Sequence, residues 1–593
     1  MKSDLIHDLV VAALSSALSR AKDSGELDLS TLPALTVDLP KREEWGDLSS
    51  NVAMLVAPKV RRPPLEVATV LASILKDEGQ DLFDRVDVAP PGFLNFTIHP
   101  SRWGDTLKII EALGSAFGSS QIGKGQRVLV EYVSANPTGP LHVGHGRGAA
   151  LGHAASNLLQ ATGYSVQREY YINDAGRQLK LLGASVLARY QEYHGLPFTF
   201  PDDGYHGTYI HAVAEAMAQE LGATLLDVNP EEAEEQSSAF ACMQLLERIR
   251  QDLRVFGVEF DEWYSETSLL GAGHLTKALE YLKEKDLVFQ KDDAWWFRSS
   301  QFQDEKDRVV AKQDGTYTYL ASDIAYHRDK LHRGFDSLIN IWGADHHGYV
   351  PRMQAAVQAF GYRKEQFRVV LVQMVNLLRA GKKVEMSKRA GEFVTLREVV
   401  DEVGADAAKF FFLMRRSDSH LDFDLELAKR QSADNPVYYV QYAHARIASL
   451  FRVAESRGIQ VPSLQDVDLS FVTTQDELRL IKQLSCYPGI IEASAASLEP
   501  HRVTFYLQEL AAQLHTYYNK HRILPSHDPG VVGESQEDGG GGFSASLDDP
   551  SAQEHRETVT PELTAARLAL MRQVQTVIRN GLAVLGVSAP EHM

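Results

Sequence analysis

Two histidines separated by two residues stand where an apolar run gives way to small residues. The run covers 127–133, and His142-Val-Gly144-His145-Gly-Arg-Gly148 follows it within a few residues. Backbone N–H groups at a glycine-rich helix start can approach a phosphate closely, and the helix dipole favours the negative charge. Imidazoles three residues apart share one helical face and can reach the same oxygens. The segment predicts a phosphate-binding site made by His142, Gly144, His145 and Gly148.

A second candidate is the basic, glycine-flanked loop at 379–391, which contains Lys382, Lys383 and Lys388. Standing alone, it would be an ordinary exposed basic turn. It follows the apolar run 368–374, however, and the carboxyl ends of parallel strands share the sheet edge where ligands bind. We therefore expect both loops to bind one phosphorylated ligand.

Apolar runs that alternate with helical patterns predict the elements that position these loops. Such alternation favours a parallel sheet with helices on both faces, so we predict an α/β, Rossmann-like catalytic core at 121–433. Its predicted strands are 127–133, 166–172, 337–342 and 368–374. Because the second and third strands lie farther apart than a crossover needs, we predict an inserted helical subdomain around 190–300.

The flanking segments predict two more domains. Residues 1–120 combine helical patterns with a Pro-Pro-Gly hairpin signal at 86–98, as in a small α+β domain. An apolar repeat of three or four residues predicts an all-α bundle at 434–593. Inside it, the acidic, glycine-rich segment 526–560 is predicted to be a mobile surface insertion without an assigned function.

Composition limits the class of protein. The formal charge of −19 argues against indiscriminate nucleic-acid binding but leaves a specific RNA partner possible. Apolar runs are too short to span a membrane, and the N-terminus resembles an amphipathic helix with acids rather than a signal peptide. Cys242 and Cys486 form no zinc-ligand or disulfide pattern. We expect a cytoplasmic protein without a structural metal.

In this order and spacing, the two loops resemble the signatures of the class I aminoacyl-tRNA synthetases, usually H-I-G-H and K-M-S-K-S. The second loop departs from that pattern, with Glu385 in place of the first lysine and Arg389 in place of the final serine. The second lysine of the pattern is present as Lys388. Lys382, Lys383 or Arg389 could supply the charge that Glu385 removes.

The remaining motifs are similar to arginyl-tRNA synthetases of the bacterial type, over almost the whole chain outside 526–560. They lie at 131–145, 315–323, 342–349, 419–424 and 435–446. The resemblance implies ATP-dependent attachment of L-arginine to tRNA(Arg) through an arginyl-adenylate, with ATP as its Mg²⁺ complex. It also implies a monomer whose N-terminal domain contacts the tRNA corner and whose bundle binds the anticodon.

The same resemblance implies roles for individual residues. Asp323 would accept the guanidinium fork in two parallel hydrogen bonds, which lysine cannot form, and Tyr319 would add a hydroxyl one turn earlier. Glu131, Ser134 and Asn136 would hold the α-amino and carboxylate groups of arginine. His142 and His145 would stabilise the α-phosphate transition state and Lys388 the departing pyrophosphate. The expected ATP contacts are His142, Gly144, His145, Gly148, His346, Met386, Ser387 and Lys388.

Two groups keep alternative interpretations. Asp345 and His346 could line the substrate or adenosine pocket, or belong to a metal site, since an acid beside histidines suits both. An aromatic stripe with an arginine on one predicted helix is typical of helix packing and could instead stack on RNA bases. The stripe consists of Tyr438, Tyr439, Tyr442 and Arg446.

Three rival functions follow from the same motifs. Another synthetase of this class, cysteinyl or glutamyl, needs a different side-chain pocket, and the Tyr319/Asp323 pair and the missing zinc cluster speak against the cysteinyl type. A small-molecule nucleotidyltransferase shares the histidine motif but needs no long bundle. A non-catalytic RNA-binding paralogue would lose the phosphate loops, and only Glu385 favours it.

Overall fold

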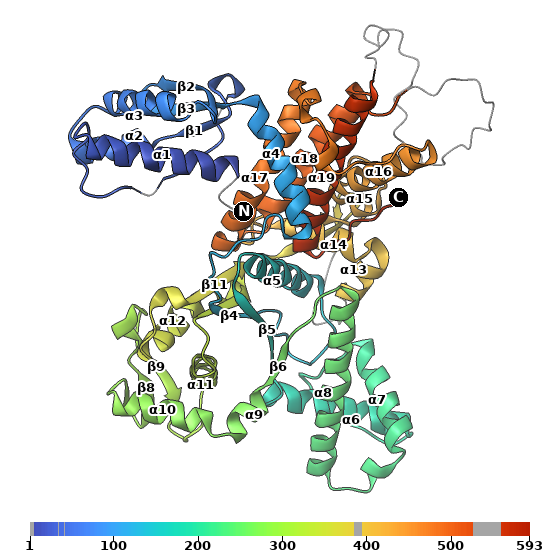
Figure 1. Ribbon diagram of the computed structural model, residues 1–593. Helices are drawn as coiled ribbons and strands as arrows, with labels where there is room; N and C mark the ends of the chain where they lie inside the picture. Colours follow the sequence, from blue (N-terminus) through green and yellow to red (C-terminus); the bar gives the residue numbers. More distant parts are fainter. Residues whose placement is uncertain (1–4, 34, 41, 385–393, 526–558) are drawn as a thin grey trace, which may run out of the picture.

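The computed structural model describes residues 5–33, 35–40, 42–384, 394–525 and 559–593 (Figure 1). Three of the predicted phosphate contacts, Met386, Ser387 and Lys388, lie outside the described residues, and so does almost all of the segment 526–560. Among the described residues, no helix is both long and apolar enough to cross a membrane.

A five-stranded parallel sheet forms the centre of the catalytic part, in the order β11-β10-β4-β5-β6. Its strands are β4 (Arg127–Glu131), β5 (Ser165–Ile172), β6 (Glu262–Ser265), β10 (Ser337–Gly343) and β11 (Phe367–Val372). The four predicted strands and their parallel pairing are confirmed. Strand β6 was missed because it is a short, half-exposed edge strand and lacks the apolar run of a buried parallel strand.

Helices surround this sheet, and an insertion projects from it at the bottom of Figure 1. The helices of this part are α5 (Val143–Ala161), α6 (Arg177–Tyr193), α7 (Thr208–Leu221), α8 (Pro230–Val255), α9 (Glu266–Gly271), α10 (His274–Glu284), α11 (Tyr319–His332) and α12 (Val350–Ala359). The insertion is helical through α8, as predicted. The prediction was wrong near its end, where an antiparallel sheet forms from β7 (Val288–Lys291), β8 (Ala294–Phe297) and β9 (Arg308–Ala311).

The N-terminal unit is a small α+β structure, as predicted (Figure 1). It contains α1 (Ile6–Asp23), β1 (Leu48–Ser50), α2 (Val52–Val60), α3 (Pro64–Glu78), β2 (Phe83–Ala89) and β3 (Phe93–Ile98). The predicted hairpin is β2–β3, which turns at Pro90-Pro91-Gly92. Helix α4 (Pro100–Leu113) then runs along the C-terminal bundle, packing against α17 (Gln475–Ser497) and α19 (Pro561–Leu585).

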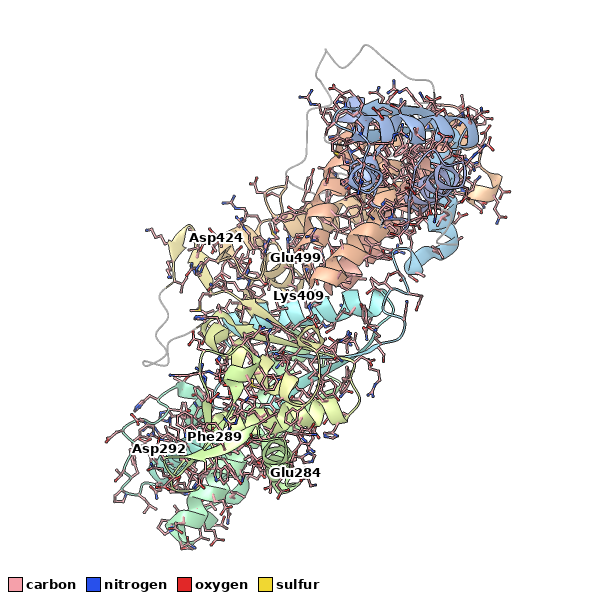
Figure 2. All side chains as sticks on the ribbon, turned by 90° about the vertical axis from the view of Figure 1, so that its left-hand side faces the viewer. Glu284, Phe289, Asp292, Lys409, Asp424 and Glu499 are labelled. Atoms are coloured by element: carbon pink, nitrogen blue, oxygen red, sulfur yellow. The ribbon has the colours of Figure 1, made fainter. Side chains whose placement is uncertain are left out.

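The C-terminal part is helical beyond one small sheet. That sheet has the order β13-β12-β14, from β12 (Val375–Arg379), β13 (Lys382–Lys383) and β14 (Leu421–Asp424). The helices are α13 (Leu396–Val403), α14 (Ala405–Leu413), α15 (Leu425–Lys429), α16 (Pro436–Ser456), α17 (Gln475–Ser497), α18 (His501–Lys520) and α19 (Pro561–Leu585). Lys409 of α14 joins the parts (Figure 2), since its ammonium donates to the carbonyls of Gly257 and Gly586.

Helix α5 packs so closely that two of its glycines have no room for a side chain. A Cβ on Gly152 would lie 2.2 Å from the ring of Tyr132, just after β4. A Cβ on Gly146 would lie 2.6 Å from Leu396, on α13. Gly146 and Gly152 therefore serve packing, and they hold α5 between β4 and α13.

Candidate active site

The two histidines form a stacked pair at the start of α5. Their ring centroids are 3.7 Å apart with planes 20° apart. The Nδ1 of His142 accepts from the backbone N–H of Gly144 at 3.1 Å, and the Nδ1 of His145 accepts from that of His142 at 3.2 Å. Because both Nδ1 atoms act as acceptors, the neutral rings carry their proton on Nε2. The helix start is thus capped by imidazoles whose Nε2–H groups are donors.

The chain between β4 and α5 bends through unusual backbone conformations. Val133 and Ser134 have φ of 68° and 39°, a region that residues with side chains rarely occupy. This bend ends β4 at Glu131, two residues before the predicted end of the strand. Gly144 lies beside the ring of His142, and Gly148 faces open space. Strained backbone of this kind clusters at functional sites.

One flank of the second loop lies close to the histidines. Thr395, which begins α13, forms an isolated antiparallel bridge with His142, and Leu396 N–H donates to the Leu141 carbonyl at 2.8 Å. On the other flank, the exposed Lys382 and Lys383 form β13. The described chain therefore leaves the small sheet at β13 and returns beside the first loop.

Asp323, predicted to bind the guanidinium, is half-buried on α11 and accepts a hydrogen bond from the hydroxyl of Tyr349. Burial raises the pKa of Asp323 to about 6, against the opposing effect of this hydrogen bond. Tyr319 is 72% exposed at the start of α11, at the rim of the site. Sequence reasoning missed Tyr349, although the motif at 342–349 ends on it.

A second buried carboxylate, Glu266, lies beside Asp323 and was also missed. Its neighbours Ser265 and Thr267 are both held by Asp174, which accepts from the Ser265 hydroxyl at 2.5 Å and from the Thr267 N–H at 2.8 Å. Burial, with the negative charges of Asp323 and Asp174, raises the pKa of Glu266 to about 7. These carboxyls form an acidic pocket suited to a cation.

Glu131, at the carboxyl end of β4, is buried in a polar network. It accepts from the ammonium of Lys330, from the Asn340 amide at 3.0 Å and from the Ser134 hydroxyl at 3.0 Å. Lys330 is fully buried and balances the charge of Glu131 but not that of Glu266. Sequence reasoning missed Lys330, although it lies two helical turns after Asp323 on the same face of α11.

The remaining predicted residues lie at the rim. Asn136 donates to the side chain of Gln178 at 2.6 Å. Asp345 and His346 are largely exposed after β10, and His346 contributes to the positive potential felt by Asp323. Within the described ranges, no group of three or more His, Cys, Asp or Glu side chains is arranged to hold a metal ion.

The aromatic stripe on α16 packs within the bundle. The Tyr442 ring stacks on His515 of α18 with centroids 5.7 Å apart, and the Arg446 guanidinium lies 3.9 Å from the ring centroid of Tyr518. Tyr439 also contacts His515. The structure supports the packing interpretation for these residues.

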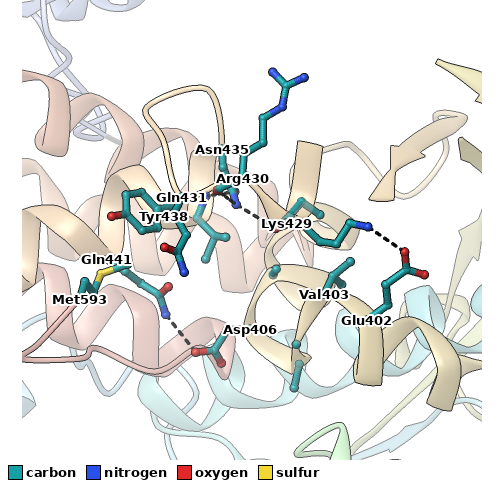
Figure 3. Close-up of a pocket in the computed structure, with 15 residues that line it drawn as sticks. Glu402, Val403, Asp406, Lys429, Arg430, Gln431, Asn435, Tyr438, Gln441 and Met593 are labelled. Atoms are coloured by element: carbon teal, nitrogen blue, oxygen red, sulfur yellow. Dashed lines mark hydrogen bonds and ion pairs between the residues drawn. The ribbon is translucent and has the colours of Figure 1, made fainter. Parts of the chain in front are cut away.

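A pocket of about 640 Å³ lies elsewhere, between α14, α16 and the C-terminal Met593 (Figure 3). Its polar groups pair with each other, since Gln441 donates to Asp406 at 2.9 Å and Lys429 pairs with Glu402 at 3.0 Å. It presents no cluster of cations for a polyphosphate, so the candidate active site is the histidine edge of the sheet.

The groups of the site follow the carboxyl ends of adjacent parallel strands. Glu131 ends β4, Asp174 follows β5, Glu266 follows β6 and Tyr349 follows β10. With the histidine pair at the start of α5, this arrangement defines a class I aminoacyl-tRNA synthetase.

The family model for the class I (R) tRNA synthetase catalytic domain matches residues 108–418. The arginyl-tRNA synthetase N-terminal domain matches 5–98, and the DALR anticodon binding domain matches 440–534 and 553–593.

Whole-chain comparisons agree with these models. The arginine–tRNA ligase of Syntrophotalea carbinolica is 47% identical over 98% of this chain and 99% of its own length. That of Citrifermentans bemidjiense is 49% identical over 96% and 97%. The Thermus thermophilus arginyl-tRNA synthetase structure superposes with a TM-score of 0.71, at 22% identity, over 99% of this chain and all of the other. The chain belongs to the arginyl-tRNA synthetase family.

Proposed function

We propose that this protein joins arginine to its tRNA in two steps at the carboxyl edge of the parallel sheet. The arginine carboxylate attacks the α-phosphorus of ATP, which enters as its Mg²⁺ complex, and pyrophosphate leaves. A terminal ribose hydroxyl of tRNA(Arg) then attacks the carbonyl carbon of the arginyl-adenylate and releases AMP. Neither step needs a covalent enzyme intermediate, so catalysis consists of positioning and electrostatic stabilisation.

One observation carries the choice of amino acid, namely the pairing of the half-buried carboxyl of Asp323 with the buried carboxyl of Glu266. Burial raises the pKa of both groups, to about 6 and about 7, so the two carboxyls hold negative charge at a cost. A planar guanidinium relieves that cost and offers five donors in a fixed fork. Glu131, whose charge acts on Asp323, would hold the α-amino and carboxylate groups of arginine together with Ser134 and Asn136.

The histidine pair supplies the donors for the phosphoryl transfer. Each Nδ1 accepts a backbone N–H, so each Nε2–H can donate to an oxygen of the α-phosphate. These donors stabilise the negative charge that accumulates in the transition state. Lys388, outside the described residues, keeps its predicted role at the pyrophosphate, with Lys382 and Lys383 on the exposed flank.

The direct test is aminoacylation of total tRNA by the purified protein with ATP and each of the 20 amino acids in turn. We expect charging with arginine alone, and loss of charging when ATP is omitted. Charging with a different amino acid overturns the proposal. So does arginine activation that proceeds equally well without tRNA, because the family resemblance implies that tRNA must bind first.

Arginine binding should weaken as the pH falls. Asp323 and Glu266 have raised pKa values in the free protein, so each is increasingly protonated below its value of about 6 or about 7 and cannot pair with guanidinium. Between pH 8 and pH 5.5 we expect the arginine Kd to rise about 10- to 100-fold, with protons released on binding. Isothermal titration of arginine without ATP, in buffers of different ionisation enthalpy, measures both effects.

Two variants identify the groups that titrate. Glu266→Gln should remove the upper part of the pH dependence, whereas Glu262→Gln, on the exposed edge of β6, should leave it unchanged. A Kd that is constant with pH in the wild-type protein contradicts the assignment. Tighter binding at low pH contradicts it as well.

We further propose that the protein acts as a cytoplasmic monomer. Sedimentation equilibrium of the full chain, with and without tRNA, tests the monomer. A dimer at micromolar concentration contradicts it.

A further inference from the structure

Arg147, in the second turn of α5, is buried and its contacts are all to backbone. It is 1% exposed, and its Nη1 donates to the carbonyls of Gln373 at 2.9 Å and Ser419 at 2.8 Å. Its Nη2 donates to the carbonyl of Arg416 at 2.9 Å. Asp418, whose charge acts on Arg147, pairs with Arg416. A buried cation is therefore held by three carbonyls contributed by two distant segments.

These carbonyls mark the base of the small sheet that carries β13. Gln373 lies two residues before β12, and Ser419 lies two residues before β14, which pairs with β12 in parallel. Gln373 N–H also donates to the Ser417 carbonyl at 2.8 Å, which joins the two segments directly. Arg147 thus fixes the start of both strands to the helix that begins with the histidine pair.

The shape of the side chain matters more than its charge. Burial lowers the pKa of Arg147 to about 10, so the group stays protonated at neutral pH. A guanidinium is a rigid planar fork that reaches several acceptors at fixed angles, whereas a lysine ammonium is a single point on a flexible stem. A charge without an acidic partner in contact is costly to bury, and here it provides a fixed orientation between two elements.

We propose that Arg147 is a positioning residue for amino-acid activation, setting the orientation of the β12–β13 hairpin relative to His142 and His145. This inference rests on the proposed function. Arg147 keeps the hairpin lysines Lys382 and Lys383 in a fixed position relative to the start of α5, where the phosphates bind. The acidic pocket is built from β4, α9 and α11 instead, and none of these contributes an acceptor to Arg147.

The test compares Arg147→Lys and Arg147→Met with the wild-type full chain in arginine-dependent ATP–pyrophosphate exchange with tRNA present. We expect kcat to fall about 10- to 50-fold in the methionine variant, because misplacement of reacting groups is costly, and less in the lysine variant. The KM for ATP should rise, and the KM for arginine should stay within about twofold. The matched control is Arg168→Met, since Arg168 contacts Asn157 and Gln160 at the far end of α5.

The split between kcat and the arginine KM separates positioning from general damage. A methionine variant that melts like the wild type and retains its kcat overturns the proposal, and so does an equal loss in kcat and arginine KM. If the methionine variant does not fold, the lysine variant decides, because an unchanged kcat there also overturns the proposal. A wild-type protein that activates no arginine would instead contradict the proposed function itself.

Discussion

Replacing His142 or His145 with alanine lowers the rate of arginine activation about 100- to 1,000-fold, the usual loss when one preorganised donor to a transition-state oxyanion is removed. In the proposed mechanism the Nε2–H groups of the stacked pair supply these donors, because each Nδ1 accepts a backbone N–H. Asp323 lies on α11 and Glu266 on α9, so the proposed guanidinium site is built from other elements than the start of α5. Arginine affinity should therefore change by less than about threefold. Pyrophosphate exchange gives the rate, and titration gives the affinity.

The control for this experiment is His332→Ala, at the exposed end of α11, which should leave both quantities unchanged. Each catalytic variant should melt within a few degrees of the wild type, although loss of the His142 cap weakens the start of α5 by about 1 kcal/mol. A parallel loss of rate and arginine affinity contradicts a transition-state role for the pair.

Asp323→Asn should lower kcat/KM for arginine about 1,000-fold. The substitution preserves shape and an oxygen that can accept from Tyr349, but it removes the charge that pairs with the guanidinium. Truncating one partner of a buried, hydrogen-bonded charge pair costs about 2–5 kcal/mol, and the loss should be mainly in the KM for arginine. Steady-state aminoacylation at varied arginine, with ATP and tRNA saturating, measures it.

Two features make this prediction specific. The KM for ATP should stay within about twofold of the wild-type value, because the histidine helix is unaltered. Asp286→Asn, at an exposed carboxylate after α10, should change nothing. If the Asp323→Asn protein keeps the wild-type KM for arginine, another group recognises the side chain of the substrate arginine.

The sequence predicts the sheet because strands β4, β10 and β11 carry runs of branched apolar residues, which is typical of parallel strands. Strands β6 and β8 lack such runs, because they are short and partly exposed and carry tryptophans in place of branched apolar residues. The pattern of apolar residues in a sequence indicates burial, so it does not reveal edge strands whose side chains are mostly exposed.

The site was predictable in part for a similar reason. Local spacing identifies His142 and His145, which belong to one helix start, and the resemblance to known synthetases identifies Asp323. Tyr349 and Glu266 reach Asp323 from other strand ends, so only the fold brings them together. Lys330 could have been predicted from the sequence, since its spacing from Asp323 places both residues on one face of α11. Its pairing with Glu131 depends on how α11 packs against β4, which local spacing does not give.

The comparison of arginine with citrulline tests the central claim most directly. Citrulline has a neutral urea oxygen in place of one guanidinium nitrogen, so it has nearly the same shape but lacks the charge and two of the five N–H donors. If Asp323 and Glu266 read the guanidinium, kcat/KM for charging citrulline should be lower by about 10,000-fold, because buried acceptors are left unpaired. A ratio within about tenfold would contradict the claim that these carboxylates select the amino acid.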